Sequence, residues 1–136
     1  MSEAGLAAEA EVRRAAEALV SAFGHGDLDA YFACFADDAT FLFHTTDRLL
    51  TSTDEYRREW ARWAAEDGFR VLDCTTTDTV VQMLGDNAVL THRVRTSVSS
   101  HEGEDVLNER ETIVFSRRDG GRWLAVHEHL SPAPGA

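Results

Sequence analysis

The pattern of apolar and polar positions divides the chain into a helical first half and a strand-rich second half. In residues 3–23 apolar side chains recur every three or four positions between Glu and Arg, which predicts an amphipathic helix. Gly24-His25-Gly26 ends this helix, and Asp27 caps a short second helix through Phe35. Residues 39–45 are rich in strand-forming side chains and predict the first strand.

A third helix follows, capped by Thr53 or Asp54, in which Tyr56, Trp60 and Trp63 recur at helical spacing. Beyond Gly68 the pattern changes to that of long strands separated by hairpin turns. The predicted strands are residues 69–84, 88–100, 106–117 and 122–130. Helices first and an antiparallel meander second predict an α+β fold, with helices packed on one face of a curved sheet. We expect a single domain over residues 1–131 and a mobile tail over residues 132–136.

The last predicted strand carries two histidines. Side chains alternate along a strand, so Trp123, Ala125, His127 and His129 are expected on one face. Two imidazoles beside a tryptophan indicate a cavity whose groups titrate near neutral pH.

The register of the last hairpin has two alternatives. A two-residue turn at Asp119-Gly120 places Arg110 opposite His129, whereas a loop two residues longer places Glu111 there. Arginine would lower the pKa of His129 and suit a base, and glutamate would raise it and suit an acid. The sequence leaves both registers open.

Composition narrows the possible partners. The formal net charge is -11, and all 13 basic residues are arginine. This acidity argues against a nucleic-acid or anionic-membrane partner, since both select basic patches. No run approaches the roughly 20 apolar residues of a membrane span, so we expect a cytoplasmic protein. Cys34 and Cys74 are expected to be free thiols.

Several short motifs occur in a characteristic order: residues 26–31 (GDLDAY), 36–41 (ADDATF), 85–88 (GDNA), 117–120 (RRDG) with Trp123, and 126–131 (VHEHLS). In this order they resemble the SnoaL-like domains of the nuclear transport factor two-like superfamily, and also the association (hub) domain of calcium/calmodulin-dependent protein kinase. The resemblance implies a conical fold, three N-terminal helices on a strongly curved, mainly antiparallel sheet around a pocket. This scaffold hosts isomerases, cyclases, hydrolases, binding modules and oligomerisation hubs, so it leaves function open.

Two of the resembling families suggest roles for single residues of this chain. In ketosteroid isomerase, the general-base aspartate falls on Phe43 here and the oxyanion-hole tyrosine near Leu19, so that constellation is absent. In the hub, Tyr31 matches a pocket tyrosine and Arg95 an arginine facing a carboxylate-binding pocket. A second hub arginine falls at Ile113, whereas this chain has Arg110 three residues earlier.

From these observations we expect a pocket for a small organic molecule that carries a carbonyl or carboxylate group. His129, His127 and Arg110 are the candidate catalytic residues, and the candidate ligand-binding residues are Tyr31, Arg95, Trp60, Trp63, Phe43 and His92. The leading function is cofactor-free acid–base catalysis of the isomerase, cyclase or dehydratase type. The alternative is a non-catalytic binding or hub-like assembly module.

A metal site is a further alternative. It would use His127, His129 and either His44 or His92, but no acidic ligand stands at a chelating spacing, so no metal is expected. Leu124, Val126 and Leu130 are expected on the convex face of the sheet, which predicts a homodimer or larger oligomer.

Overall fold

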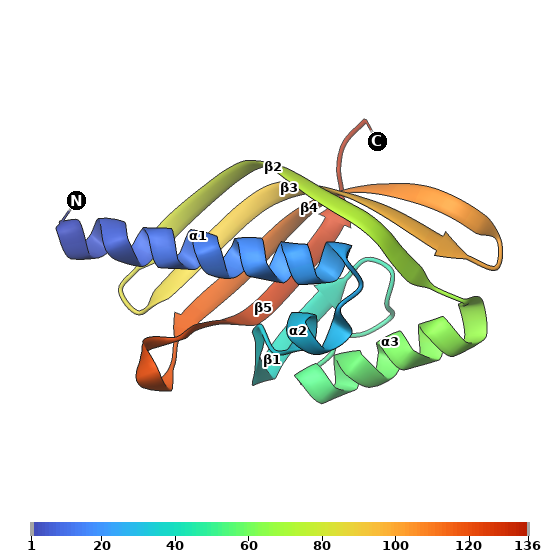
Figure 1. Ribbon diagram of the computed structural model, residues 1–136, viewed down its shortest axis with the longest axis horizontal. Coiled ribbons are helices and arrows are strands. Elements are labelled where there is room, and N and C mark those ends of the chain that lie inside the picture. Colours follow the sequence, from blue (N-terminus) through green and yellow to red (C-terminus); the bar gives the residue numbers. More distant parts are fainter. Residues whose placement is uncertain (1, 136) are drawn as a thin grey trace.

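The computed structural model describes residues 2–135 and contains, within that range, three α-helices and a five-stranded sheet. The elements along the chain are α1 (Glu3–Gly24), α2 (Leu28–Phe32), β1 (Phe35–Phe43), α3 (Thr53–Asp67), β2 (Arg70–Leu84), β3 (Asn87–Ser100), β4 (Gly103–Arg117) and β5 (Trp123–Pro132). The curved sheet wraps around α1, and α2 and α3 lie at its β1 edge (Figure 1). The expected α+β fold is confirmed.

The helices begin where polar side chains cap them, although one cap differs from the prediction. Ser52, not Thr53 or Asp54, caps α3, because its hydroxyl accepts a hydrogen bond from the Glu55 backbone N–H. The Thr53 hydroxyl instead donates to the carbonyl of Ala36 in β1 at 2.7 Å. Asp27 caps α2 as expected. However, α2 ends at Phe32 because Phe35 already begins β1, four residues before the predicted strand start.

The sheet has the strand order β1-β5-β4-β3-β2. Strands β2 to β5 pair antiparallel as the predicted meander, and β1 pairs parallel to β5. β5 is therefore an inner strand, between β1 and β4. Its far end also extends further than predicted: Pro132 still pairs with Glu109, and the buried Ala133 donates its N–H to Asn108.

A β-bulge in β5 changes which of its side chains face the helices. Phe115 pairs with Ala125, but Val114 pairs with His127, so Val126 is an extra residue with no partner in β4. Before the bulge, Trp123 and Ala125 are buried; after it, Glu128 is buried and His129 is exposed. The bulge therefore reverses the inward and outward alternation within one strand.

The core joins the inner sheet face to aromatic side chains of the helices. Phe41, Ile113 and Phe115 of the sheet are fully buried and pack in one cluster with Tyr31 and Tyr56.

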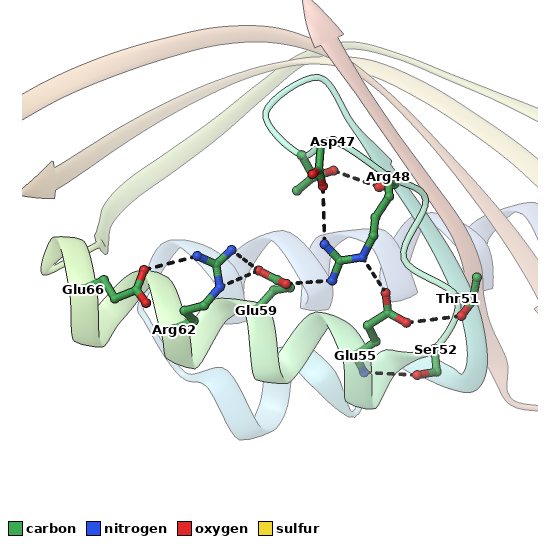
Figure 2. Close-up of polar contacts among 9 residues, drawn as sticks. Asp47, Arg48, Thr51, Ser52, Glu55, Glu59, Arg62 and Glu66 are labelled. Atoms are coloured by element: carbon green, nitrogen blue, oxygen red, sulfur yellow. Dashed lines mark hydrogen bonds and ion pairs between the residues drawn. The ribbon is translucent and has the colours of Figure 1, made fainter.

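Acidic side chains on the solvent side of α3 are held by two arginines. Glu59 accepts hydrogen bonds from both Arg48 and Arg62 (Figure 2). These hydrogen bonds lower the pKa of Glu59. Among residues 2–135 no helix is long and apolar enough to cross a bilayer.

Candidate functional site

A cavity of about 740 Å³ lies between the inner face of the sheet and the helices. Its wall is mostly aromatic and aliphatic and includes Phe23, Phe43, Trp60, Trp63, Phe69, Leu107 and Leu130. Its volume is typical of pockets for small organic molecules. The polar side chains divide into a group on the inner sheet face and a group around the β3–β4 hairpin.

Three glutamates of adjacent strands face this cavity: Glu109 and Glu111 from β4 and Glu128 from β5. All three are buried, and Glu128 has only 2% of its surface exposed. Inner positions of these strands otherwise hold apolar residues; Glu128 itself pairs with Phe41 on one side and Ile113 on the other. Carboxyl groups in such surroundings are costly to ionise unless they are paired.

Burial raises the pKa of Glu128 well above its ordinary value of 4.5. The negative charge of the neighbouring Glu111 and the hydrogen bond between the two carboxyl groups raise this pKa further. Glu128 is therefore a carboxylic acid that keeps its proton where an ordinary glutamate has lost it. The two groups form a hydrogen-bonded carboxyl pair at the cavity wall.

Two tyrosines lie beside this pair. The Tyr31 hydroxyl donates to Glu128 Oε2 at 3.5 Å and lies 2.9 Å from the hydroxyl of Tyr56. Burial is the main reason that the pKa of each tyrosine is raised well above 10.0. Both phenols consequently stay protonated and can donate hydrogen bonds.

Two histidines hold the other carboxylates. His92 Nε2 lies 2.5 Å from Glu111 Oε1, and both side chains are almost completely buried. His44 Nε2 lies 2.6 Å from Glu109 Oε2 nearer the surface. Each histidine fixes the orientation of its glutamate. Among residues 2–135, no group of three or more His, Cys, Asp or Glu side chains is placed to hold a metal ion.

The predicted site residues fall into two separated groups. Tyr31, Phe43, Trp60 and Trp63 line the cavity, and His92 lies behind it against Glu111. Their part in ligand binding remains a prediction. His127, His129, Arg110 and Arg95 lie on the opposite, outer face of the sheet, so the structure does not bring the two groups together.

The expected position of the histidines inside the cavity is wrong, because the prediction assumed unbroken alternation through β5. The bulge at Val126 turns both imidazoles outward, where His127 Nδ1 lies 2.8 Å from the Thr40 hydroxyl. Burial, followed by the nearby His129, lowers the pKa of His127. Both expected registers are also wrong: Thr112, not Arg110 or Glu111, lies opposite His129.

The prediction that arginines line the cavity and bind a carboxylate is also wrong. Arg95 and Arg110 are exposed on the outer face, and Ile113 is buried in the core. Within residues 2–135 no arginine lines the cavity, while seven carboxyl side chains do. The charge of the cavity therefore argues against the expected carboxylate-bearing ligand. Leu130 likewise lines the cavity and does not contribute to the convex face.

The sequence reasoning missed the three glutamates. For β4 a signal was present: Glu109 and Glu111 share the alternation of Ile113 and Phe115, so acidic side chains occupy an apolar face. For Glu128 the alternation was misleading, because the bulge is not visible in the local pattern.

Comparison with solved structures places this fold among known ones. An NTF2-like protein of unknown function in nutrient uptake from Rhodospirillum rubrum is 23% identical, with a TM-score of 0.77 over 90% of this chain and 98% of that one. A ketosteroid isomerase-like protein from Erwinia carotovora atroseptica is 19% identical, with a TM-score of 0.76 over 92% and 96%. The S. rosetta CaMKII hub is 23% identical, with a TM-score of 0.72 over 90% and 95%. At these identities the similarity establishes the fold.

No curated protein matches the sequence. The sequence profile of the SnoaL-like domain matches residues 12–135, which include every strand, α2, α3 and the second half of α1. The expected resemblance is thus confirmed, and this chain belongs to the SnoaL-like domain family.

Proposed function

We propose that the protein is a cofactor-free acid–base enzyme acting on a small, largely apolar organic molecule, of the isomerase or dehydratase type. One observation carries the proposal: two buried carboxyl groups, Glu128 and Glu111, face the same aromatic cavity, and burial together with the charge of Glu111 raises the pKa of Glu128. Two carboxyl groups held in different protonation states are a common basis for acid and base roles in one site. We assign the acid role to Glu128 and the base role to Glu111.

The reaction proceeds by two proton transfers. Glu111, oriented by His92, removes a proton from a carbon next to a carbonyl group. Glu128 supplies its proton to the oxygen that gains negative charge, or to a hydroxyl that leaves as water. Tyr31, which donates to Glu128 and lies within hydrogen-bond distance of the Tyr56 hydroxyl, holds the Glu128 carboxyl in place. The proton gained by Glu111 then returns to Glu128 through their shared hydrogen bond, so the pair is restored without a cofactor.

The proton-abstraction step can be measured without knowing the substrate. The probe is 5-nitrobenzisoxazole, an aromatic molecule smaller than the cavity that opens to a coloured phenolate when a base removes its ring proton. We expect the wild-type protein to turn this probe over, with Glu111 as the proton acceptor. Glu111→Gln and Glu128→Gln should each reduce this rate by about a hundredfold.

Glu17→Gln, an exposed change on α1, is the matched control and should keep the wild-type rate. Equal turnover in the wild type and in the double variant Glu111→Gln with Glu128→Gln would rule out this carboxyl pair as the proton acceptor. Retained far-ultraviolet circular dichroism checks that each variant is folded.

Self-association through the outer sheet face is a second candidate function. One observation favours it: Leu42 of β1 is 41% exposed on this face, where it pairs with His129 of β5, and Leu124 and Val126 of β5 are half-buried. A homodimer or larger ring would cover these side chains. Light scattering tests the proposal, and a mass of 15.1 kDa at micromolar concentration would contradict it.

A further inference from the structure

The cavity reaches the surface at the end of α3 and at the β3–β4 hairpin, where its lining residues are exposed, and we call this part the mouth. The two segments lie at the same side of the molecule (Figure 1). The charged side chains that line this part are Glu66 and Asp67 from α3 and Glu102 and Asp105 from the hairpin. His101, whose ring packs against Gly68, is the one basic side chain lining the cavity within residues 2–135. Four carboxyl side chains thus lie at this end of the cavity, in addition to the three glutamates of its inner wall.

Only one of these four carboxylates is neutralised by an arginine. Glu66 pairs with Arg62 at 3.2 Å, and Arg62 also binds Glu59, as Figure 2 shows. Asp67, Glu102 and Asp105 have no arginine or histidine nitrogen within 4.0 Å in the described chain. The mouth therefore carries negative charge that the protein itself leaves unbalanced.

The end of α3 increases this imbalance. A helix C-terminus carries partial negative charge, and basic residues in the last turn normally offset it. The last turn of α3 has no basic residue and instead holds Glu66 and Asp67. This arrangement is unfavourable for the isolated helix, and a cation bound at the mouth would relieve it.

The wall next to the mouth consists of three aromatic rings. Trp60, Trp63 and Phe69 line the cavity, and the centroid of the Phe69 ring lies 5.2 Å from that of Trp60 and 6.1 Å from that of Trp63. Aromatic faces attract organic cations and also bury apolar carbon. Carboxyl groups that attract a cation and aromatic rings that bury apolar carbon therefore adjoin at the mouth.

We propose that the cavity selects a protonated organic amine, with the ammonium group at the mouth and the apolar body directed toward Glu128. The proposal deepens the proposed function, because it rests on the same cavity and names the chemical class that enters it. The ammonium would lie among Asp67, Glu102 and Asp105, and the hydrocarbon part against the three rings. A carboxylate of the same shape would be repelled at the entrance.

Three probes of one shape but different charge test this class: 2-naphthylmethylamine, 2-naphthylmethanol and 2-naphthoate. We expect calorimetry to give an affinity for the amine about tenfold higher than for the alcohol, with the naphthoate weakest. The preference for the amine should decrease as salt is added, because exposed charges are screened.

A double variant at the mouth, Glu102→Gln with Asp105→Asn, should bring the affinity for the amine close to that for the alcohol. Its unchanged affinity for the alcohol would show that the cavity is still folded. The matched control is Asp37→Asn with Asp119→Asn, which changes net charge equally at exposed positions outside the cavity lining. That control should keep the preference for the amine.

Equal affinity for amine and alcohol in the wild type would overturn the inference, as would an equal loss of preference in both double variants. The second result would mean that only the overall charge of -11 attracts the amine. Either failure leaves the nitrobenzisoxazole assay unaffected, so the amine class and the acid–base function can fail separately.

Discussion

Replacing Glu128 with glutamine should change how the stability of the protein depends on pH. Burial and Glu111 raise the pKa of Glu128 well above 4.5 in the folded state, whereas the unfolded chain returns this carboxyl to water. Between the two pKa values the folded protein binds a proton that the unfolded chain has released. The stabilising contribution of Glu128 is therefore complete below pH 4.5 and is lost as the pH rises through the folded-state pKa.

The size of this effect follows from the linkage of protons to folding. Because the folded state binds one more proton than the unfolded chain, the free energy of unfolding falls by about 1.4 kcal/mol for each unit by which the pH rises between the two pKa values. The amide of Glu128→Gln has nearly the shape of the protonated carboxyl and does not titrate. As the pH rises above 4.5 toward the folded-state pKa, we therefore expect the free energy of unfolding of the wild type to fall relative to that of the variant, by at most about 1.4 kcal/mol per pH unit.

Urea unfolding followed by tryptophan fluorescence measures the difference, because Trp60 and Trp123 are buried. Glu17→Gln again serves as the control, since an exposed glutamate should leave the pH dependence unchanged. Parallel pH profiles for the wild type and Glu128→Gln would refute the reasoning. Glu128 would then be ionised in the folded state and could not be the proton donor.

Three further outcomes are expected. His127→Ala and His129→Ala should leave nitrobenzisoxazole turnover within about twofold of the wild type, because both imidazoles face outward and act on no group in the cavity; a hundredfold loss would place one of them in the reaction. Phe41→Ala should lower the free energy of unfolding by about 3–5 kcal/mol in urea titrations, since the ring is fully buried between Phe35 and Tyr56, and a loss below 1 kcal/mol would contradict that packing. Burial raises the pKa of Cys74 to about 11, so iodoacetamide near pH 8 should label this thiol far more slowly in the folded protein than in urea, and equal rates would show an accessible thiolate.

The sequence by itself determined the elements and their order. Helical spacing in residues 3–23 and around Trp60 predicted α1 and α3, and the turn signals after Gly68 predicted the meander of β2 to β5. These are local properties, set by periodicity, capping and glycine turns, and each can be recognised within about 15 residues of chain. Combined with the ordered motifs, they were enough to identify the fold.

Tertiary structure alone decided which side chains meet in the cavity. Val126 adds one residue to β5 opposite β4, and this single bulge exchanges His127 and His129 for Glu128 on the inner face. Nothing in the local pattern marks it, because a bulge is settled by how two strands pair across the sheet. Tyr31 and Glu128 are likewise 97 residues apart and meet only when α2 packs on the sheet. Element types follow from short-range forces, whereas the chemistry of the site follows from strand register, which depends on the whole sheet.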